Sequence, residues 1–426
     1  MTNRILTPRI LAMETLAHLE NDLVLGNHVH TDYSKEFAAV GDTVDVKRPQ
    51  RYAGQDDNLD VTNYNEDLAA GKLPLKLDKT VTIKFSLSAK ERTLSVKSDQ
   101  IQADYIEPAV TKLKDRIDKE LAATGKNSFY NFWGTPGTLP SSFSDLSDPG
   151  ALLTELGVPT NRRYGFHSPF AGSKLAAGLG SVYVQKMAKT ALEEATFGRY
   201  GGFTNFESVH IPSHTAGDYS GTLLVNGANQ NVTYTESRDA LTQTLNIDGG
   251  SNSTTGFLKK GDVFTIAGVY SVNPVTKNST TQLQHFVVMA DADTNGSGEA
   301  QLTISPPMVV YDAAYDTAVA AEVTDAAFAS VTAAPADNAA ITVVSGAANS
   351  THRNSLLMQK NALTLVTRPL TIETHGSYET STVMGNKVSI ACSKWGDPNT
   401  LGANYRFDML FDVASLQPGH GLRLAN

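Results

Sequence analysis

The stretch Lys260–Val272, K-G-D-V-F-T-I-A-G-V-Y-S-V, carries apolar side chains on both faces of one extended strand. A strand that is apolar on both sides is typical of the interior of a small barrel or sandwich. The Gly261-Asp262 pair is a turn that starts the strand, and Gly268 permits a bulge or a close approach of another backbone. The stretch contains no catalytic motif. It predicts a buried β element that holds the shape of a domain.

The surroundings of this strand have the composition of an all-β domain. From Gly217 to about Val344 the chain is rich in Thr, Ser, Asn, Gly and Val, and turn signals are frequent. Within it, 312–340 fits a loop or a short helix. We therefore predict a β domain over 217–347 that is inserted into a mixed domain, to which the chain returns over 348–426. Such an insertion costs little, because the entropy of closing a loop grows slowly with its length.

Amphipathic helices are predicted before the insertion. The first begins at Pro8 and ends near Gly26, and its narrow apolar face can dock on its own chain or on a neighbouring copy. The residues of that face are Ala12, Leu16, Leu19 and Leu23. The second helix spans 104–125, with a capping box of Asp104 and Glu107. Its apolar stripe consists of Ile106, Val110, Leu113, Ile117 and Leu121, while charged residues, Asp118 among them, cover the other faces. A further helix is predicted over 182–197.

Strand patterns between the first two helices predict a projecting hairpin. A short strand passes through Val44 and Val46 and ends before Pro49, and 80–88 alternates strictly between apolar and polar residues. A hairpin cannot bury its apolar face alone, so it needs a partner surface. The basic run Lys84, Lys90, Arg92 and Lys97 on the return strand fits either a solvated strand face or a salt-sensitive contact with an acidic patch on another copy. The inter-subunit contact candidates are Lys76, Lys84, Lys90, Arg92, Leu16 and Leu23.

The composition of the chain argues against several classes of function. The 426 residues include 44 acidic and 35 basic ones, and the net charge of -9 argues against a protein that wraps or condenses nucleic acid. The single cysteine, Cys392, excludes an intramolecular disulfide, and its apolar neighbours predict a buried strand thiol instead of a nucleophile. No apolar run is long enough for a membrane span, and the amino terminus lacks a signal-peptide pattern.

No catalytic, cofactor or metal site is predicted. The stretch 291–296 imitates the start of a calcium loop, but Leu302 stands where the loop needs an acid. His28, His30 and Asp32 have no second cluster to complete a metal site. The chain has neither a Walker-type phosphate loop nor a G-x-S-x-G elbow. We therefore expect that the protein is not an enzyme and binds no cofactor.

The order of these segments and their motifs resemble one family. The long helix contains Y-I-E-P-A-V-T-K-L-K-D-R-I-D at 105–118. The mixed domain holds R-Y-G-F-H-S-P-F at 163–170 and G-G-F-T-N-F-E-S-V-H-I-P-S-H-T-A-G at 201–217. The insertion carries K-G-D-V-F-T-I-A-G-V-Y-S-V-N-P-V-T-K at 260–277. Across essentially the whole chain, this combination resembles the P-twenty-two-like major coat proteins of tailed bacteriophages.

The resemblance implies an α+β capsid subunit with the HK-ninety-seven shell fold. Its parts would be an N-terminal arm (1–40), an E-loop hairpin with peripheral strands (41–97), a spine helix (98–127), the first part of an axial domain (128–216), an inserted six-stranded β-barrel (217–347) and a return to the axial and peripheral domains (348–426). The resemblance further implies pentamers and hexamers in a closed icosahedral shell, with a scaffolding protein and a portal as partners. Such a virion shell is assembled in the host cytoplasm, has no membrane, and encloses double-stranded DNA without sequence-specific binding.

Other classes of protein remain open from the residues alone. A non-shell structural protein, such as a phage tail or surface β protein, would consist of strands throughout, and the helix over 104–125 disfavours it. A hydrolase with a β binding insertion would need clustered acids or histidines and exposed aromatics in the insertion, whereas Trp133 and Trp395 lie outside it. A self-crosslinking shell would need a lysine, an asparagine and an acid brought together between subunits, and non-covalent assembly is the default.

Overall fold

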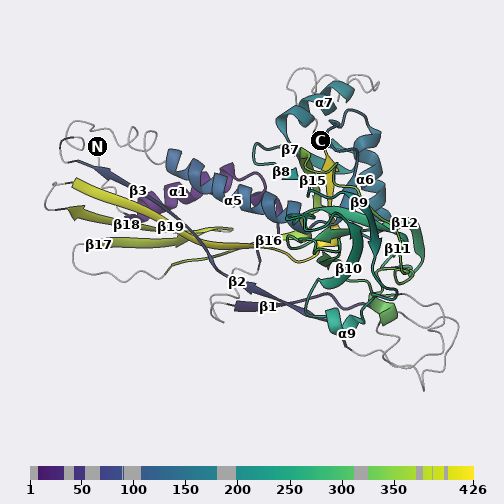
Figure 1. The fold of residues 1–426 in the computed structure, drawn as a ribbon. Coiled ribbons are helices and arrows are strands. Elements are labelled where there is room, and N and C mark those ends of the chain that lie inside the picture. The colour runs from purple at the N-terminus through teal and green to yellow at the C-terminus, as the bar shows by residue number, and fades with distance from the viewer. Residues whose placement is uncertain are drawn as a thin grey trace, which may run out of the picture. The chain divides into compact units, whose positions relative to one another are not determined.

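The computed structural model divides the chain into two compact units, whose helices and strands are drawn in Figure 1. It describes residues 8–32, 43–52, 68–88, 90, 107–179, 198–310, 325–370, 378–385, 387–397 and 402–426. The first unit is made of 1–45, 74–121 and 363–414, and the second of 46–73, 122–362 and 415–426. Helices and antiparallel strands occur together in both units, which confirms the α+β class. Among the described residues, no helix is long and apolar enough to cross a membrane.

A five-stranded sheet forms the body of the first unit. Strands β16, β19, β18 and β17 follow one another in that order, and β3 also pairs with β19 (Figure 1). Their bounds are Lys79–Leu87 for β3, Leu363–Arg368 for β16, Tyr378–Met384 for β17, Ser389–Asp397 for β18 and Gly402–Ser415 for β19. Helix α1, Pro8–Asp22, packs against β17 and β18, and the short 3-10 helix η1, Gly26–His28, follows it.

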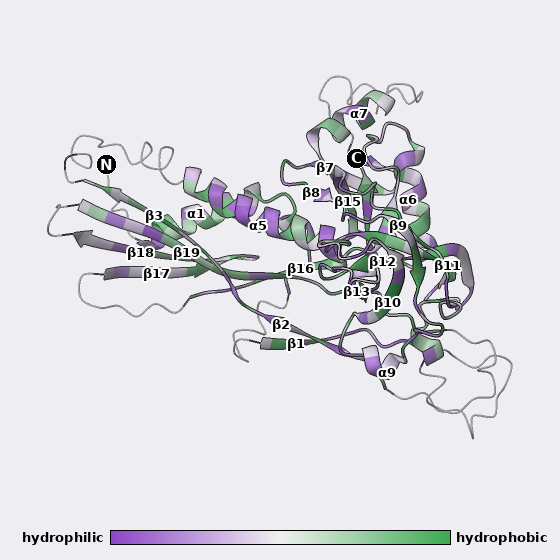
Figure 2. Ribbon diagram, viewed as in Figure 1, coloured by the Kyte–Doolittle hydropathy of each residue, from purple (hydrophilic) through white to green (hydrophobic). Residues whose placement is uncertain are grey.

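The two amphipathic helices predicted in this part of the chain are present. Helix α1 begins at Pro8 as predicted, and the residues of its apolar face, Ala12, Leu16, Leu19 and Leu23, are buried within the chain itself. Helix α5, Glu107–Ser128, ends at Ser128 instead of near Gly125. Its apolar stripe from Val110 to Leu121 is buried, and Figure 2 shows apolar and polar residues alternating along it. The proposed cap, Asp104, lies outside the described residues.

Asp118 on α5 corrects one prediction, because its side chain is fully buried and does not lie on a solvated face. Its carboxylate accepts hydrogen bonds from the backbone N–H groups of Val24 (3.1 Å), Leu25 (3.2 Å) and Gly26 (3.1 Å). These N–H groups belong to the turn between α1 and η1, where a helix end leaves donors unpaired. The carboxylate therefore fastens the end of α1 to α5. Periodicity missed this role because the donors are more than ninety positions away in the sequence.

We expect Asp118→Ala to lower the free energy of unfolding of the unassembled protein by about 2–3 kcal/mol. The change leaves buried N–H groups without an acceptor, and hydrogen bonds to a charged group are the stronger kind. Asp118→Asn keeps one acceptor oxygen and should cost less. Urea unfolding followed by circular dichroism measures the difference. The exposed Lys112→Ala on the same helix is the control, and equal effects of the alanine variants would contradict the assigned role.

Strand β3 shows the alternating burial that its sequence predicts, but its pairing differs from the predicted one. It runs antiparallel to β19, from Leu87 opposite Ala403 to Lys79 opposite Phe411. The hairpin-type pair is formed instead by β1, Thr43–Lys47, and β2, Lys72–Lys76. The apolar face of β3 is therefore half-covered by its own chain, with the rings of Phe85 and Tyr405 stacked at 5.2 Å. The alternation of apolar and polar residues shows which face of a strand is apolar, but it does not show which strand pairs with it.

The predicted β insertion is a six-stranded sheet in the second unit. The strand order is β14-β11-β12-β13-β10-β9, and a β-bridge between Leu224 and Ala340 joins its two ends. The strands are β9 Gly221–Val225, β10 Gln243–Gly250, β11 Val263–Val272, β12 Ser279–Val288, β13 Ala300–Ser305 and β14 Ile341–Val343, with the short helix α9, Tyr234–Ser237, between β9 and β10. The core cluster of this sheet includes Leu245, Phe264, Ile266, Phe286 and Ile304.

Strand β11 confirms most of what the pattern of 260–272 predicts. Val263–Ile266 is buried on both faces, as predicted. The pairing with β12 shifts between Thr265 and Tyr270, and Gly268 lies in this interval with φ +82°. The strand is therefore irregular at this glycine, which fits the bulge that Gly268 permits, since a positive φ favours a residue without a side chain. Beyond it the strand is less buried than predicted, because the side chain of Tyr270 is exposed.

A seven-stranded sheet shows how the chain returns after the insertion. The order is β4-β20-β15-β5-β7-β6, and β8 also pairs with β15. The strands are β4 Asn131–Trp133, β5 Arg163–His167, β6 Arg199–Tyr200, β7 Phe203–Glu207, β8 Ser213–Thr215, β15 Thr351–Gln359 and β20 Gly421–Ala425. The other elements are helices α6, Ser144–Glu155, and α7, Pro169–Leu179, and the 3-10 helices η4, Lys360–Ala362, and η5, Pro418–His420. Strands before and after the insertion thus share one sheet. The helix predicted over 182–197 lies outside the described residues.

Candidate functional site

The residues predicted to contact other subunits lie in the first unit. Lys76 at the end of β2, Lys84 in β3 and Lys90 are exposed, and the Nζ of Lys84 lies 5.3 Å from the centre of the Trp395 ring. Arg92 and Lys97 lie outside the described residues. Leu16 and Leu23 are only 7% and 3% exposed, because α1 docks on its own chain. Their role as subunit contacts stays a prediction, and burial leaves these two leucines little surface for it.

The described part of the chain offers no obvious reactive centre. It contains no group of three or more His, Cys, Asp or Glu side chains that could hold a metal ion. Cys392 is buried in β18, as predicted, and burial raises the pKa of its thiol to about 12. A thiol with such a pKa carries almost no thiolate at neutral pH and is a poor nucleophile.

A buried polar cluster lies where the β insertion joins the rest of the second unit. Asp262 is fully buried and accepts hydrogen bonds from His214 Nε2 (2.8 Å) and from Ser345 Oγ (3.1 Å). It also accepts from the backbone N–H groups of Gly217 (3.0 Å) and Lys259 (2.7 Å). Gly217 and Ser345 stand at the two joints of the insertion. One carboxylate therefore ties both joints to the turn that starts β11.

The charges around Asp262 are also enclosed. Burial alone would raise the pKa of Asp262, but the hydrogen bond and charge of His214 and the backbone donors outweigh it and lower the pKa. Arg423 is fully buried and donates from Nη1 to the carbonyl oxygen of Gly261 (2.6 Å). Burial lowers the pKa of Arg423 to about 9 and that of His352 to about 4. The cluster is sealed from solvent, and its hydrogen bonds fasten together the chain segments that meet there.

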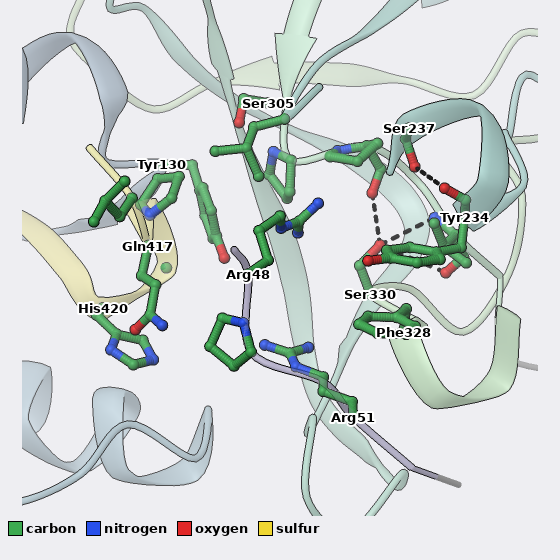
Figure 3. Close-up of a pocket in the computed structure, with 18 residues that line it drawn as sticks. Arg48, Arg51, Tyr130, Tyr234, Ser237, Ser305, Phe328, Ser330, Gln417 and His420 are labelled. Carbon is green, nitrogen blue, oxygen red and sulfur yellow. Dashed lines mark hydrogen bonds between the residues drawn. The ribbon is translucent and has the colours of Figure 1, made fainter. Parts of the chain in front are cut away.

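A cavity of about 150 Å³ lies elsewhere in the second unit, and Figure 3 shows the side chains that line it. The segment after β1 contributes Arg48, Pro49 and Arg51, and the insertion contributes Tyr234 and Phe328. Further lining residues are Tyr130, Ser237, Leu241, Ser305, Pro306, Pro307, Val309, Ser330, Leu416, Gln417, Pro418, Gly419 and His420. We call this cavity the arginine pocket. It brings together segments that are far apart in the sequence.

Arg48 is held in the arginine pocket by contacts on two sides. Its Nη1 donates to the carbonyl oxygen of Arg238 (2.9 Å), and its guanidinium carbon lies 5.8 Å from the centre of the Tyr234 ring. Tyr234 in turn stacks on Phe328 with 3.7 Å between ring centres, and its hydroxyl accepts from the N–H of Gly71 (3.2 Å). The position of Arg48 is therefore set by the β insertion.

The electrostatics of the pocket are those of cations that keep contact with solvent, since Arg48 is half-buried and Arg51 is exposed. Desolvation lowers the pKa of both Arg48 and Arg51, and the charge of Arg48 lowers that of Arg51 further. Burial lowers the pKa of His420 to about 4, and the Arg51 guanidinium adds to the effect. Desolvation raises the pKa of the Tyr130 hydroxyl. None of the residues that line the pocket is an aspartate or glutamate.

Sequence reasoning missed this pocket. The signal available was the run K-R-P-Q-R at 47–51, which places Lys47, Arg48 and Arg51 directly after a strand. A short basic run is usually a solvated surface, so it carried little weight by itself. The partners from the insertion and from the carboxy-terminal segment could not be read from it.

Comparisons with known proteins agree with this picture. The family model described as "P22 coat protein - gene protein 5" matches residues 2–425. The major capsid protein of Acyrthosiphon pisum secondary endosymbiont phage 1 is 25% identical over 283 residues, which are 64% of this chain and 66% of that protein. The match thus spans just under two thirds of that relative's length.

Solved structures of phage capsids were also found. A chain of Mycobacterium phage Che8 is 12% identical, with a TM-score of 0.45 and coverage of 94% of this chain and 90% of that one. The CUS-3 coat protein I-domain is 33% identical, with a TM-score of 0.20, and the match covers 30% of this chain and 97% of that one.

The matched family and the named relative are both shell proteins of bacteriophages. The family model covers nearly the whole length, so the chain belongs to the P22 coat protein family. The resemblance to this family stated from the sequence is therefore confirmed.

Proposed function

We propose that this capsid protein assembles with copies of itself into pentamers and hexamers of a closed icosahedral shell around the double-stranded DNA of a phage. The observation that carries the proposal is the match of the coat protein family over 2–425. The net charge of -9 supports enclosure of DNA without tight or sequence-specific binding, because strong binding needs clustered Lys and Arg.

The finer assignment of domains belongs to the same proposal. Helix α5 fits a spine helix, β1 and β2 fit the base of an E-loop hairpin, and the seven-stranded sheet fits an axial domain. The six-stranded sheet fits an inserted β-barrel, since the bridge between Leu224 and Ala340 links its first and last strands. The amino-terminal segment through 40 would act as an arm.

The partners and the place of assembly follow from the shell function. A closed shell needs an interior guide and an entrance for DNA, for which we propose a scaffolding protein and a portal. Assembly in the host cytoplasm and a final place in the virion fit a chain whose single cysteine is buried and unpaired. No observation specifically favours a tail protein or a hydrolase.

Assembly of the purified protein tests the proposed function. We expect sedimentation to show fast particles when a scaffolding protein is supplied, and electron microscopy of those fractions to show closed, uniform shells. Obligate interfaces often exceed about 2,000 Å², so assembled subunits should stay together on dilution. A monomer under every condition, with or without the scaffolding protein, would contradict the proposal and reopen the alternative of a hydrolase with a β binding insertion.

A further inference from the structure

The arginine pocket is a built site for an anion in a protein that is acidic as a whole. Its lining includes Arg48, Arg51 and His420 and no carboxylate, while the chain carries 44 acidic and 35 basic residues. We propose that this pocket binds a carboxylate side chain from a second copy of the chain, between Arg48, Arg51 and the polar groups of Tyr130 and His420. The choice of a second copy rests on the proposed function, in which copies lie next to one another.

Part of the donor capacity of the pocket is unused. The side chain of Arg51 makes no hydrogen bond or ion pair with the described residues, although a guanidinium offers five N–H donors. His420 Nδ1 is buried and also has no hydrogen-bond partner among them. Because Arg51 is exposed, water can solvate its donors, and an oxyanion bound there would replace that water and also accept a hydrogen bond from the buried His420 Nδ1.

The two arginines differ in the charges around them. Desolvation lowers the pKa of both, but the charge of Asp239 raises that of Arg48, whereas the charge of Arg48 lowers that of Arg51 further. A carboxylate between them would reverse this effect, because an opposite charge within a few ångströms favours the ionised guanidinium. Guanidinium groups bind carboxylates with two parallel hydrogen bonds, which lysine cannot do.

The size and walls of the pocket suit an acidic side chain. A volume of about 150 Å³ equals the share of about five liquid water molecules, enough for a carboxylate on a short stem. Figure 3 shows Tyr130, Gln417 and His420 on one side and Tyr234 and Phe328 on the other, with Arg48 between them. The remaining walls include several prolines, which give apolar contact to the stem of the side chain.

A nucleic acid fits the pocket less well. Single-stranded nucleic acid binds where aromatic faces are free to stack on bases along a basic groove. Here the Tyr234 ring is already stacked on Phe328 and approached by Arg48. The cations form one recess instead of a stripe, and the net charge of -9 repels a polyanion at longer range.

The test uses the unassembled full-length protein with acetylated tetraglutamate amide as the probe. With arginine side chains labelled with nitrogen-15, the Nε–H signals of Arg48 and Arg51 should shift and saturate on titration. Arg51→Gln should weaken peptide binding at least fivefold, and Arg51→Lys should restore only part of it because lysine lacks the planar fork. The matched control is Arg353→Gln, which removes an exposed arginine of β15 in the same unit and should leave binding unchanged.

Each outcome decides the proposal. Equal binding by wild type, Arg51→Gln and Arg51→Lys, with all three folded by circular dichroism, would overturn it. So would displacement of the peptide by decathymidylate at a lower concentration, which would assign the pocket to nucleic acid. If the peptide binds through Arg51 but wild type forms no shells, the pocket stands and the proposed function fails. If wild type forms shells and the peptide does not bind, the proposed function stands and the pocket proposal fails.

Discussion

Asp262→Ala is expected to lower the free energy of unfolding of the second unit by about 3–5 kcal/mol, because it removes the acceptor of a buried cluster. The change leaves the side chains of His214 and Ser345 and the N–H groups of Gly217 and Lys259 without their partner. It also removes the negative charge that supports the buried Arg423 guanidinium. The joints of the insertion should therefore open more often than in wild type.

Two measurements check this expectation. Urea unfolding gives the loss of stability, and hydrogen exchange should accelerate most at the amides of Gly217 and Lys259. The control is Asp291→Ala, because Asp291 is exposed and its carboxylate accepts one backbone hydrogen bond, from Lys260 (2.7 Å). A loss below about 1 kcal/mol for Asp262→Ala, close to that of the control, would show that the joints are held by other contacts.

Acidification from pH 7 to pH 4 should destabilise the second unit strongly. Burial lowers the pKa of His167, His285, His352 and His420 from 6.5 to about 4 in the folded protein. Below pH 6.5 the unfolded chain takes up protons that the folded chain does not, so stability falls as the pH falls toward 4. The two most buried, His167 and His352, together give a slope of up to about 2.7 kcal/mol per pH unit near pH 5.

Urea unfolding at pH 7, 6, 5 and 4.5 measures this slope on the unassembled protein. In this range the unfolded chain binds more protons than the folded chain. His167→Gln and His352→Gln should each lower that difference in the number of bound protons by about one. The Asp262 carboxylate acts in a separate window, because its pKa is lowered and its contribution is lost only below about 3.8, the usual value for an aspartate. A stability that is flat between pH 6.5 and 4.5 would contradict the burial of these histidines as neutral groups.

Much of the fold could be predicted where one element carries a strong local pattern. The double-sided apolar strand at Val263–Ile266, the stripe of α5 and the start of α1 at Pro8 were all predicted from spacing alone. The bulge at Gly268 could also be predicted, because glycine is the residue that tolerates a positive φ. These features depend on interactions within a few residues, which periodicity records.

The candidate sites could not be predicted in the same way. Asp118 has the spacing of a surface residue, and only its contact with the turn after α1 makes it a buried acceptor. Arg48 and Arg51 form an ordinary basic run until Tyr234, Gln417 and His420 close around them. A side chain's partners across ninety or more residues leave no periodic trace in the sequence.

By itself, the sequence determined the mixed α and β class, the burial of Cys392 and, through its motifs, the coat protein family. Only the tertiary structure decided that β3 pairs with β19, that α1 docks on its own chain, and that Asp262 ties both joints of the insertion. The physical reason is the distance along the sequence over which the interacting residues lie. Amphipathic patterns state which face of an element avoids water, whereas partner and register depend on which distant surfaces close packing brings together.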